Sequence, residues 1–174
     1  MNIRIAGTEY SLKNKSYEIY IQGCFHGCRG CQNPQTHDPS GGKEVNITDF
    51  LVKQRNKVDM FPTLINNIYI TGGDLLCNGD GVDTAESFSN MLKFLFPDKI
   101  LWLFTGYSED WLPSWLWWYY DIVKCGGYDE DCLNPVGSFP ASKNQKLLFN
   151  LNNKGNKLVK LYDEIDFMGD KIWK

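Results

Sequence analysis

Short apolar segments alternate with amphipathic segments along the chain. Five segments have the β-branched, aromatic and aliphatic composition of strands: 17–21, 68–71, 100–104, 122–123 and 146–151. Three segments between them repeat apolar side chains at the spacing of helices: 49–58, 84–96 and part of 109–120. This order is typical of βα units, so the sequence predicts an α/β fold with a mainly parallel sheet.

Residues with known roles at helix ends mark two of these helices. Thr48 is predicted to cap the first helix, because its hydroxyl can accept a hydrogen bond from the first turn. Asp83 and Glu86 resemble a capping pair for the second helix, which Pro97 ends. Pro113 suits the first turn of a helix but not its interior, so the sequence does not fix where the third helix begins.

Three glycine-containing loops directly follow three of the predicted strands, at 23–31, 71–74 and 105–107. The C-terminal ends of parallel strands meet at one edge of a sheet, where binding and catalytic residues gather. We therefore expect the three loops to lie side by side on one rim.

Three cysteines, Cys24, Cys28 and Cys31, lie within eight residues of the first loop. A [4Fe–4S] cluster takes one thiolate per iron, so three thiolates hold three irons and leave the fourth open to a ligand. An open metal position is typical of a reactive site rather than a structural one. The spacing therefore predicts that Cys24, Cys28 and Cys31 are the ligands of a reactive cluster.

A zinc site of the Cys3His kind is the alternative for the same cysteines, completed by His26 or His37. His26 lies between two ligands, where the loop makes it a poor fourth ligand, and no zinc-ribbon pair is found elsewhere to support His37. The iron–sulfur interpretation is therefore favoured. The remaining cysteines are scattered and are predicted to be buried or half-buried free thiols: Cys77, Cys125 and Cys132.

Composition limits the classes of protein to which the chain can belong. Its 174 residues suffice for one domain with a core. The formal net charge of −3 comes without any lysine- or arginine-rich stretch, so no nucleic-acid partner is expected. No window approaches the roughly 20 apolar residues of a membrane span, and the N-terminal residues do not resemble a signal peptide. These features predict a cytoplasmic protein, in which clustered cysteines favour metal binding over disulfides.

The residues around the cysteines resemble the cluster loop of the radical S-adenosylmethionine enzymes, in particular that of the anaerobic ribonucleoside-triphosphate reductase activating proteins. The shared features are His26 between the first two cysteines, Gly30 before the third, and the Asn-Pro-x-Thr sequence at 33–36. Three later segments resemble the same family in the same order: Thr-Gly-Gly-Asp at 71–74, Trp-Leu-Phe-Thr-Gly-Tyr at 102–107 and Ser-x-Asn-Gln at 142–145.

This resemblance implies a single radical S-adenosylmethionine domain over residues 1–174, folded as a small partial (βα) barrel. It implies an oxidoreductase that reductively cleaves S-adenosylmethionine at a [4Fe–4S] cluster. The resulting radical would generate a glycyl radical on an anaerobic ribonucleoside-triphosphate reductase, an enzyme of deoxyribonucleotide synthesis. A small electron-donor protein such as flavodoxin would supply the electron.

The resemblance also implies which residues bind S-adenosylmethionine. Gly72 and Gly73 would let the backbone approach the methionine part of the ligand. Asp74 would either offset the ligand's ammonium charge or cap the following loop. Gly30 and Gln32 would offer backbone groups to the methionyl or adenine end.

The chain departs from the family pattern in three places. Residues 8–13 contain no counterpart of an Asp-Gly-Pro-Gly-x-Arg sequence, residues 125–128 read Cys-Gly-Gly-Tyr in place of Asp-Gly-Pro-Phe, and an arginine before the Ser-x-Asn-Gln segment is missing. These differences affect partner contacts more than the cluster. We therefore expect the loop 125–144 and the aromatic segment 111–120, in which Trp117 falls outside a core-facing stripe, to help dock the reductase.

Two other functions are open from the sequence. One is a radical S-adenosylmethionine enzyme that acts on a small molecule, of the deazapurine synthase type. The other is a non-catalytic interaction module built on a Cys3His zinc site. The Asn-Pro-x-Thr and Ser-x-Asn-Gln sequences argue against the first, and the short chain leaves little room for a substrate-binding extension. Colour distinguishes the zinc module from the iron–sulfur enzyme, because an iron–sulfur protein purified without oxygen is brown and a zinc protein is colourless.

Overall fold

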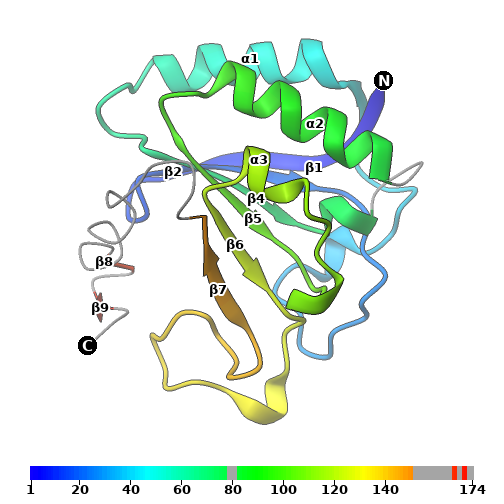
Figure 1. The fold of residues 1–174 in the computed structure, drawn as a ribbon, viewed down its shortest axis with the longest axis vertical. Coiled ribbons are helices and arrows are strands. Elements are labelled where there is room, and N and C mark those ends of the chain that lie inside the picture. Colours follow the sequence, from blue (N-terminus) through cyan, green and yellow to red (C-terminus); the bar gives the residue numbers. More distant parts are fainter. Residues whose placement is uncertain (78–81, 151–165, 168–169, 172–174) are drawn as a thin grey trace.

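A computed structural model describes residues 1–77 and 82–150, together with the backbone of two short strands, β8 (Asp166–Phe167) and β9 (Asp170–Lys171). Seven strands of the described chain form one sheet in the order β3-β1-β2-β4-β5-β6-β7 (Figure 1). Their bounds are β1 (Asn2–Ser11), β2 (Ser16–Ile21), β3 (Lys43–Asn46), β4 (Asn67–Gly72), β5 (Ile100–Phe104), β6 (Ile122–Cys125) and β7 (Lys146–Phe149).

The predicted α/β class is confirmed, but the sheet is parallel only in its centre. Strands β2, β4, β5 and β6 run parallel, whereas β1, β3 and β7 pair antiparallel with their neighbours. The expectation of a mainly parallel sheet missed β1 and β3. Most residues of these two edge-side strands are exposed or half-buried, so they lack the apolar alternation that identified the central strands.

Two amphipathic helices cover one face of the sheet and lie side by side, α1 (Ile47–Asp59) and α2 (Val82–Leu95) (Figure 1). Their buried side chains pack on alternate residues of the central strands. The core that results includes Ile19, Ile21, Leu51, Val58, Ile68, Ile70, Phe88, Leu92, Leu101, Leu103 and Val123. No helix within the described ranges combines the length and apolarity that a membrane crossing needs.

Two helix predictions need correction. Asn46, not Thr48, caps α1, because the Asn46 side chain accepts a hydrogen bond from the Asp49 amide at 3.2 Å. The segment 109–120 holds only a 3-10 turn (Glu109–Trp111) and the single helical turn α3 (Leu116–Tyr119). Leu112 is extended between them, as expected for a residue before proline.

The other element predictions agree with the structure within a few residues. The second predicted helix is α2, which begins at Val82, so Asp83 lies inside its first turn rather than at the predicted cap position. The residue before Val82 lies outside the described part of the chain. The last predicted strand is β7, which ends at Phe149, and residue 151 lies outside the described residues.

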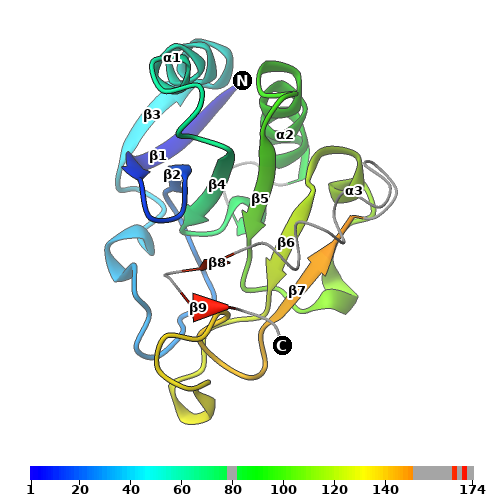
Figure 2. The same cartoon turned by 90° about the vertical axis from the view of Figure 1, so that its left-hand side faces the viewer.

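The central parallel strands all end at one edge of the sheet. Figure 2 shows β4, β5 and β6 pointing toward this edge, where the loops after β2 and β6 also gather. The predicted rim is therefore the place where a functional site is to be found.

Candidate metal centre

One buried carboxylate joins the three strand-end loops. Asp74, after β4, is 1% exposed, and its Oδ2 atom accepts hydrogen bonds from the Thr105 hydroxyl (2.7 Å) and the Gly106 amide (2.9 Å). The same oxygen lies 2.7 Å from Nε2 of His26, in the cysteine loop after β2. The Leu76 amide donates to Oδ1 at 3.0 Å. The prediction of three loops on one rim is confirmed, and Asp74 is the residue at which they meet.

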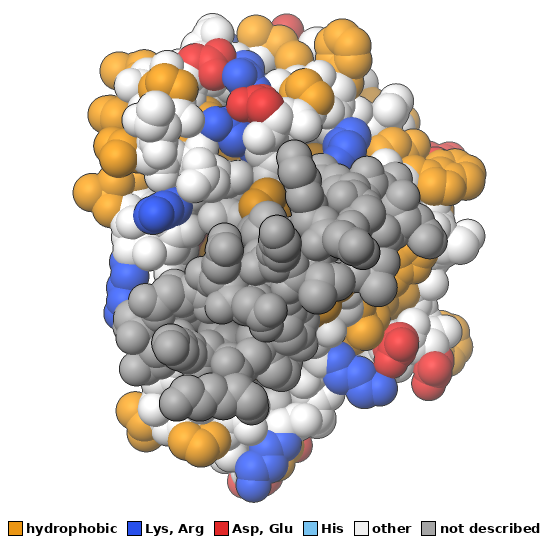
Figure 3. Space-filling view, turned by 60° about the vertical axis from the view of Figure 1, so that its left-hand side comes forward, with side chains coloured by type: hydrophobic (Ala, Val, Ile, Leu, Met, Phe, Trp, Pro, Cys, Tyr) orange, Lys and Arg blue, Asp and Glu red, His pale blue; other side chains and the backbone are white. Residues whose placement is uncertain are grey.

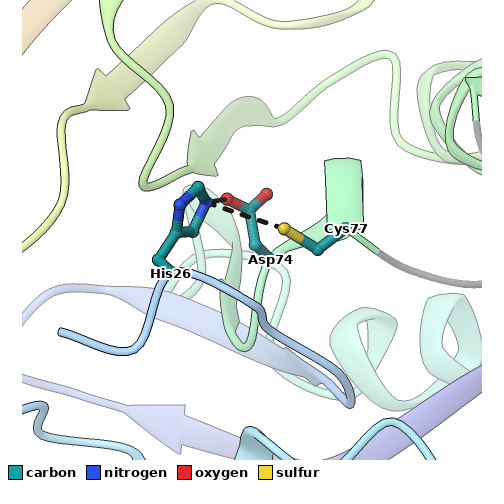
Figure 4. Close-up of side chains that lie close together, drawn as sticks. All are labelled: His26, Asp74 and Cys77. Atoms are coloured by element: carbon teal, nitrogen blue, oxygen red, sulfur yellow. Dashed lines mark hydrogen bonds and ion pairs between the residues drawn. The ribbon is translucent and has the colours of Figure 1, made fainter.

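His26 extends from the cysteine loop toward Asp74 and Cys77 (Figure 4). The hydrogen bond to Asp74 raises the pKa of the His26 imidazole to about 10. The ring also packs edge-on against Tyr107, with 4.7 Å between the ring centroids. A Cβ atom at Gly106 would overlap the imidazole, which explains why the residue before Tyr107 is glycine.

The Asn-Pro-x-Thr sequence closes the cysteine loop back onto the end of β2. The Gly23 amide donates to the Thr36 carbonyl at 2.8 Å, and the Thr36 hydroxyl donates to the Asn33 carbonyl at 2.7 Å. The Asn33 amide donates to the sulfur of Cys31 at 3.4 Å. This segment therefore fixes the loop and gives one predicted metal ligand an N–H···S contact.

The Ser-x-Asn-Gln sequence supports the opposite side of the cysteine loop. The Asn144 side chain donates to the Gly127 carbonyl at 2.8 Å, and the Gln145 side chain donates to the Gly126 carbonyl at 3.1 Å. A Cβ atom at Gly127 would lie 3.2 Å from the Cys28 sulfur. The Ser-x-Asn-Gln segment therefore holds the backbone of Gly126 and Gly127 close to Cys28, a second predicted metal ligand.

Ion pairs tie the loop 125–144 to the cysteine loop. Arg29 donates to the Glu130 carboxylate and to both oxygens of Asp131, at 2.7 and 2.8 Å. Gly30 has a φ of +72°, and a Cβ atom there would overlap the Glu130 carboxylate. Exposed ion pairs of this kind contribute about 1 kcal/mol or less to stability, so they orient the loop rather than hold the fold together.

A cavity of about 560 Å³ opens between this rim and the sheet face opposite the helices. All three loop cysteines line it, as do the turn 72–74 and Gln32, whereas Gly30 does not. Its sheet wall consists of side chains from the four parallel strands: Glu18, Tyr20, Tyr69, Thr71, Phe104 and Lys124. One cavity therefore collects the predicted metal ligands and all but one of the predicted cofactor-binding residues.

Packing of the backbone requires glycine at 72 and 73. A Cβ atom at Gly73 would overlap the Gly23 carbonyl oxygen and lie 2.9 Å from the Ile21 carbonyl oxygen. Gly72 has a φ of +88°, and a Cβ atom there would lie 2.9 Å from Cβ of Tyr20. These contacts are within the protein, so a side chain at Gly73 would disturb the fold before it met any ligand.

The donor set fits a multinuclear cluster better than a single zinc ion. The sulfur ligands of one tetrahedral zinc lie about 3.8 Å apart, as a Zn–S distance of about 2.3 Å requires. Within the described chain, Cys24, Cys28 and Cys31 do not form a group whose donor atoms lie within 4.8 Å of one another. His26, a candidate for the fourth zinc ligand, is engaged by Asp74. Three separated thiols on a cavity wall fit a [4Fe–4S] cluster.

Cys77 lies at this site, which sequence reasoning missed. As predicted, its thiol is free and half-buried, but its sulfur lies 3.6 Å from Nε2 of His26, and its thiol interacts electrostatically with that of Cys24. The interaction with Cys24, followed by that with His26, lowers the pKa of the Cys77 thiol below its ordinary value. The signal available in the sequence was that Cys77 follows Asp74 by only three residues. In the structure, these residues form a short turn in which the Cys77 amide donates to the Asp74 carbonyl at 3.0 Å.

Comparison with known proteins assigns this architecture to a class of iron–sulfur proteins. Residues 15–148 match the family model of the 4Fe-4S single cluster domain. That segment contains the three-cysteine loop, the Asp74 contacts and the cavity.

Three related proteins identify the family within this class. The anaerobic ribonucleoside-triphosphate reductase-activating protein of Enterobacteria phage T4 is 30% identical over 138 residues, which cover 76% of this chain and 82% of that protein. The protein of the same name from Haemophilus influenzae is 29% identical over 132 residues, covering 73% of this chain and 83% of its own. The one from Pasteurella multocida is 28% identical over 134 residues, covering 73% and 82%. The chain belongs to the family of anaerobic ribonucleoside-triphosphate reductase-activating proteins.

Proposed function

We propose that this chain is a radical S-adenosylmethionine enzyme that activates an anaerobic ribonucleoside-triphosphate reductase by generating a glycyl radical on it. The observation that carries the proposal is the cavity in which three thiols, the turn 72–74 and the sheet face meet. The names of the family's members supply the target. We further propose a cytoplasmic location, a partial (βα) barrel formed by residues 1–174 as one domain, and a flavodoxin-like electron donor.

The three loop thiolates would hold three irons of the cluster and leave the fourth available to the amino and carboxylate groups of S-adenosylmethionine. With an added electron, the cluster and its ligand would supply the radical chemistry that removes a hydrogen atom from glycine. Gly72 and Gly73 present backbone to the cavity, and Gln32 lies on the same wall. The geometry favours loop capping over ligand binding for Asp74, because four protein groups already donate to its oxygens.

The two other functions receive less support. A zinc interaction module does not fit the match to a 4Fe-4S domain or the engagement of His26 by Asp74. A radical enzyme that acts on a small molecule shares the cavity. It does not explain why each relative named above is an activator of a protein.

The cluster-loaded protein is expected to convert S-adenosylmethionine into 5′-deoxyadenosine and methionine when dithionite is the reductant. The assay is chromatography of the anaerobic reaction without any reductase present. The Cys28→Ala variant is the control and should give no product, because its cluster lacks one thiolate. A fully loaded wild-type protein that forms no 5′-deoxyadenosine even with the reductase added would refute the proposed chemistry.

The structure does not support Trp117 as the tryptophan that docks the reductase. Trp117 is half-buried against the core, and its carbonyl accepts a hydrogen bond from Asn150, so it is not an exposed docking residue. Trp111 and Trp118 are exposed instead, at 76% and 67%. On the described part of the surface in Figure 3, hydrophobic side chains lie in separate groups, so that view does not show one continuous patch.

Trp118→Ala is therefore expected to weaken glycyl-radical formation on the reductase while leaving uncoupled cleavage of S-adenosylmethionine unchanged. An exposed tryptophan in an interface contributes roughly 2 kcal/mol, which corresponds to a loss of affinity of about 30-fold. Trp117→Ala should lower the melting temperature instead. Phe94→Ala, at an aromatic residue on α2 that is 76% exposed, is the matched control. Equal radical yields from the Trp118 and Phe94 variants would exclude Trp118 from docking.

A further inference from the structure

Lys124 places a positive charge on the sheet wall of the cavity, close to the cysteine loop. It follows Val123, which is buried in the core beneath the helices, so strand alternation turns Lys124 to the opposite face. Lys124 lines the cavity together with Phe104, its partner on β5. The Lys124 carbonyl accepts a hydrogen bond from the Thr105 amide at 2.9 Å, which ties this residue to the rim.

The titratable groups that act on this ammonium are Asp74, two predicted metal ligands and the free thiol of Cys125. Cys28, Cys31 and Asp74 all interact electrostatically with Lys124, and Gly127 lies against the Cys28 sulfur. Among the residues that the structure describes, the Lys124 side chain has no hydrogen bond or ion pair. Burial lowers its pKa, and the neighbouring thiols and Asp74 oppose that shift. A half-buried cation without a partner gains most from an anion placed in the cavity.

We propose that the Lys124 ammonium is the counter-charge of the iron–sulfur cluster and raises the potential at which the cluster accepts an electron. A cluster held by three thiolates is negatively charged, and one-electron reduction adds a further negative charge. A fixed cation in a weakly screened cavity stabilises the reduced form more than the oxidised form. The inference rests on the proposed ligands Cys24, Cys28 and Cys31, but not on the binding of S-adenosylmethionine.

The test is a redox titration of the reconstituted cluster, followed by EPR without S-adenosylmethionine. Lys124→Met keeps an unbranched side chain, one atom shorter, and removes its charge. At a given solution potential, its ratio of reduced to oxidised cluster should be about tenfold lower than in the wild type, equivalent to a midpoint about 59 mV lower. Lys124→Arg should stay close to the wild type, because it keeps the charge.

Lys146→Met is the matched control, since it removes an exposed lysine on the neighbouring strand that pairs with Glu109. It should leave the midpoint unchanged. The proposal is overturned if Lys124→Met titrates like the wild type, or if Lys124→Arg or Lys146→Met shifts as far as Lys124→Met. If the methionine variant does not assemble a cluster, Lys124→Gln is titrated under the same criteria. A lowered midpoint in a protein that never cleaves S-adenosylmethionine would support this inference and refute the proposed function.

Discussion

Replacing any one of Cys24, Cys28 and Cys31 by alanine is expected to abolish the visible absorbance and the bound iron of the anaerobically reconstituted protein. Each of the three lines the same cavity, and removing one leaves two thiolates for a cluster that needs three from this loop. The loss should be nearly complete for each single variant, measured as iron and sulfide per chain.

The scattered cysteines provide the controls. Cys125→Ala and Cys132→Ala should retain the cluster, because neither residue is among those that line the cavity. Cys77→Ala is the sharpest control, since its thiol interacts electrostatically with that of Cys24 without belonging to the loop. It should also retain the cluster. If two of these three residues proved necessary for iron binding, the open-iron site would be the wrong description.

Asp74→Ala is expected to produce the largest loss of stability, about 3 kcal/mol or more. The substitution leaves the donors of buried Thr105 and of half-buried Gly106 and His26 without their common acceptor. It also separates the three loops, so cluster content should fall together with the melting temperature. Thermal unfolding of the cluster-free protein measures the structural part alone.

A surface carboxylate serves as the control for this substitution. Asp59 pairs with Arg55 at 2.7 Å, and its side chain is 47% exposed, so Asp59→Ala should cost about 1 kcal/mol or less. An Asp74→Ala protein that unfolds at the wild-type temperature and binds a full cluster would show that the rim is held by other contacts.

The sequence was sufficient for the parts of this site that are local. Cys24, Cys28 and Cys31 share one loop, and the glycine turn at 72–74 follows the next strand of the parallel centre, so strand order alone predicted that they would meet. The helices α1 and α2 were identifiable because each repeats buried, mostly apolar side chains at helical spacing.

Contacts between loops that are far apart in the sequence could not be predicted from strand order. The bond between His26 and Asp74 joins residues 48 positions apart, and either residue alone looks like an ordinary loop residue. The overlap that a side chain at Gly73 would create is with the backbone of Gly23, so the reason for glycine there emerges only in the folded chain. Strands β1 and β3 escaped prediction because their sequences do not alternate clearly.

Mössbauer spectroscopy of the ⁵⁷Fe-reconstituted protein tests the central claim most directly, since it distinguishes the individual irons of the cluster. If three thiolates from one loop leave one iron open, adding S-adenosylmethionine should change the isomer shift of about one iron in four. The other three should keep their thiolate-ligated signature. Identical spectra with and without S-adenosylmethionine, from a cluster of full occupancy, would contradict the account.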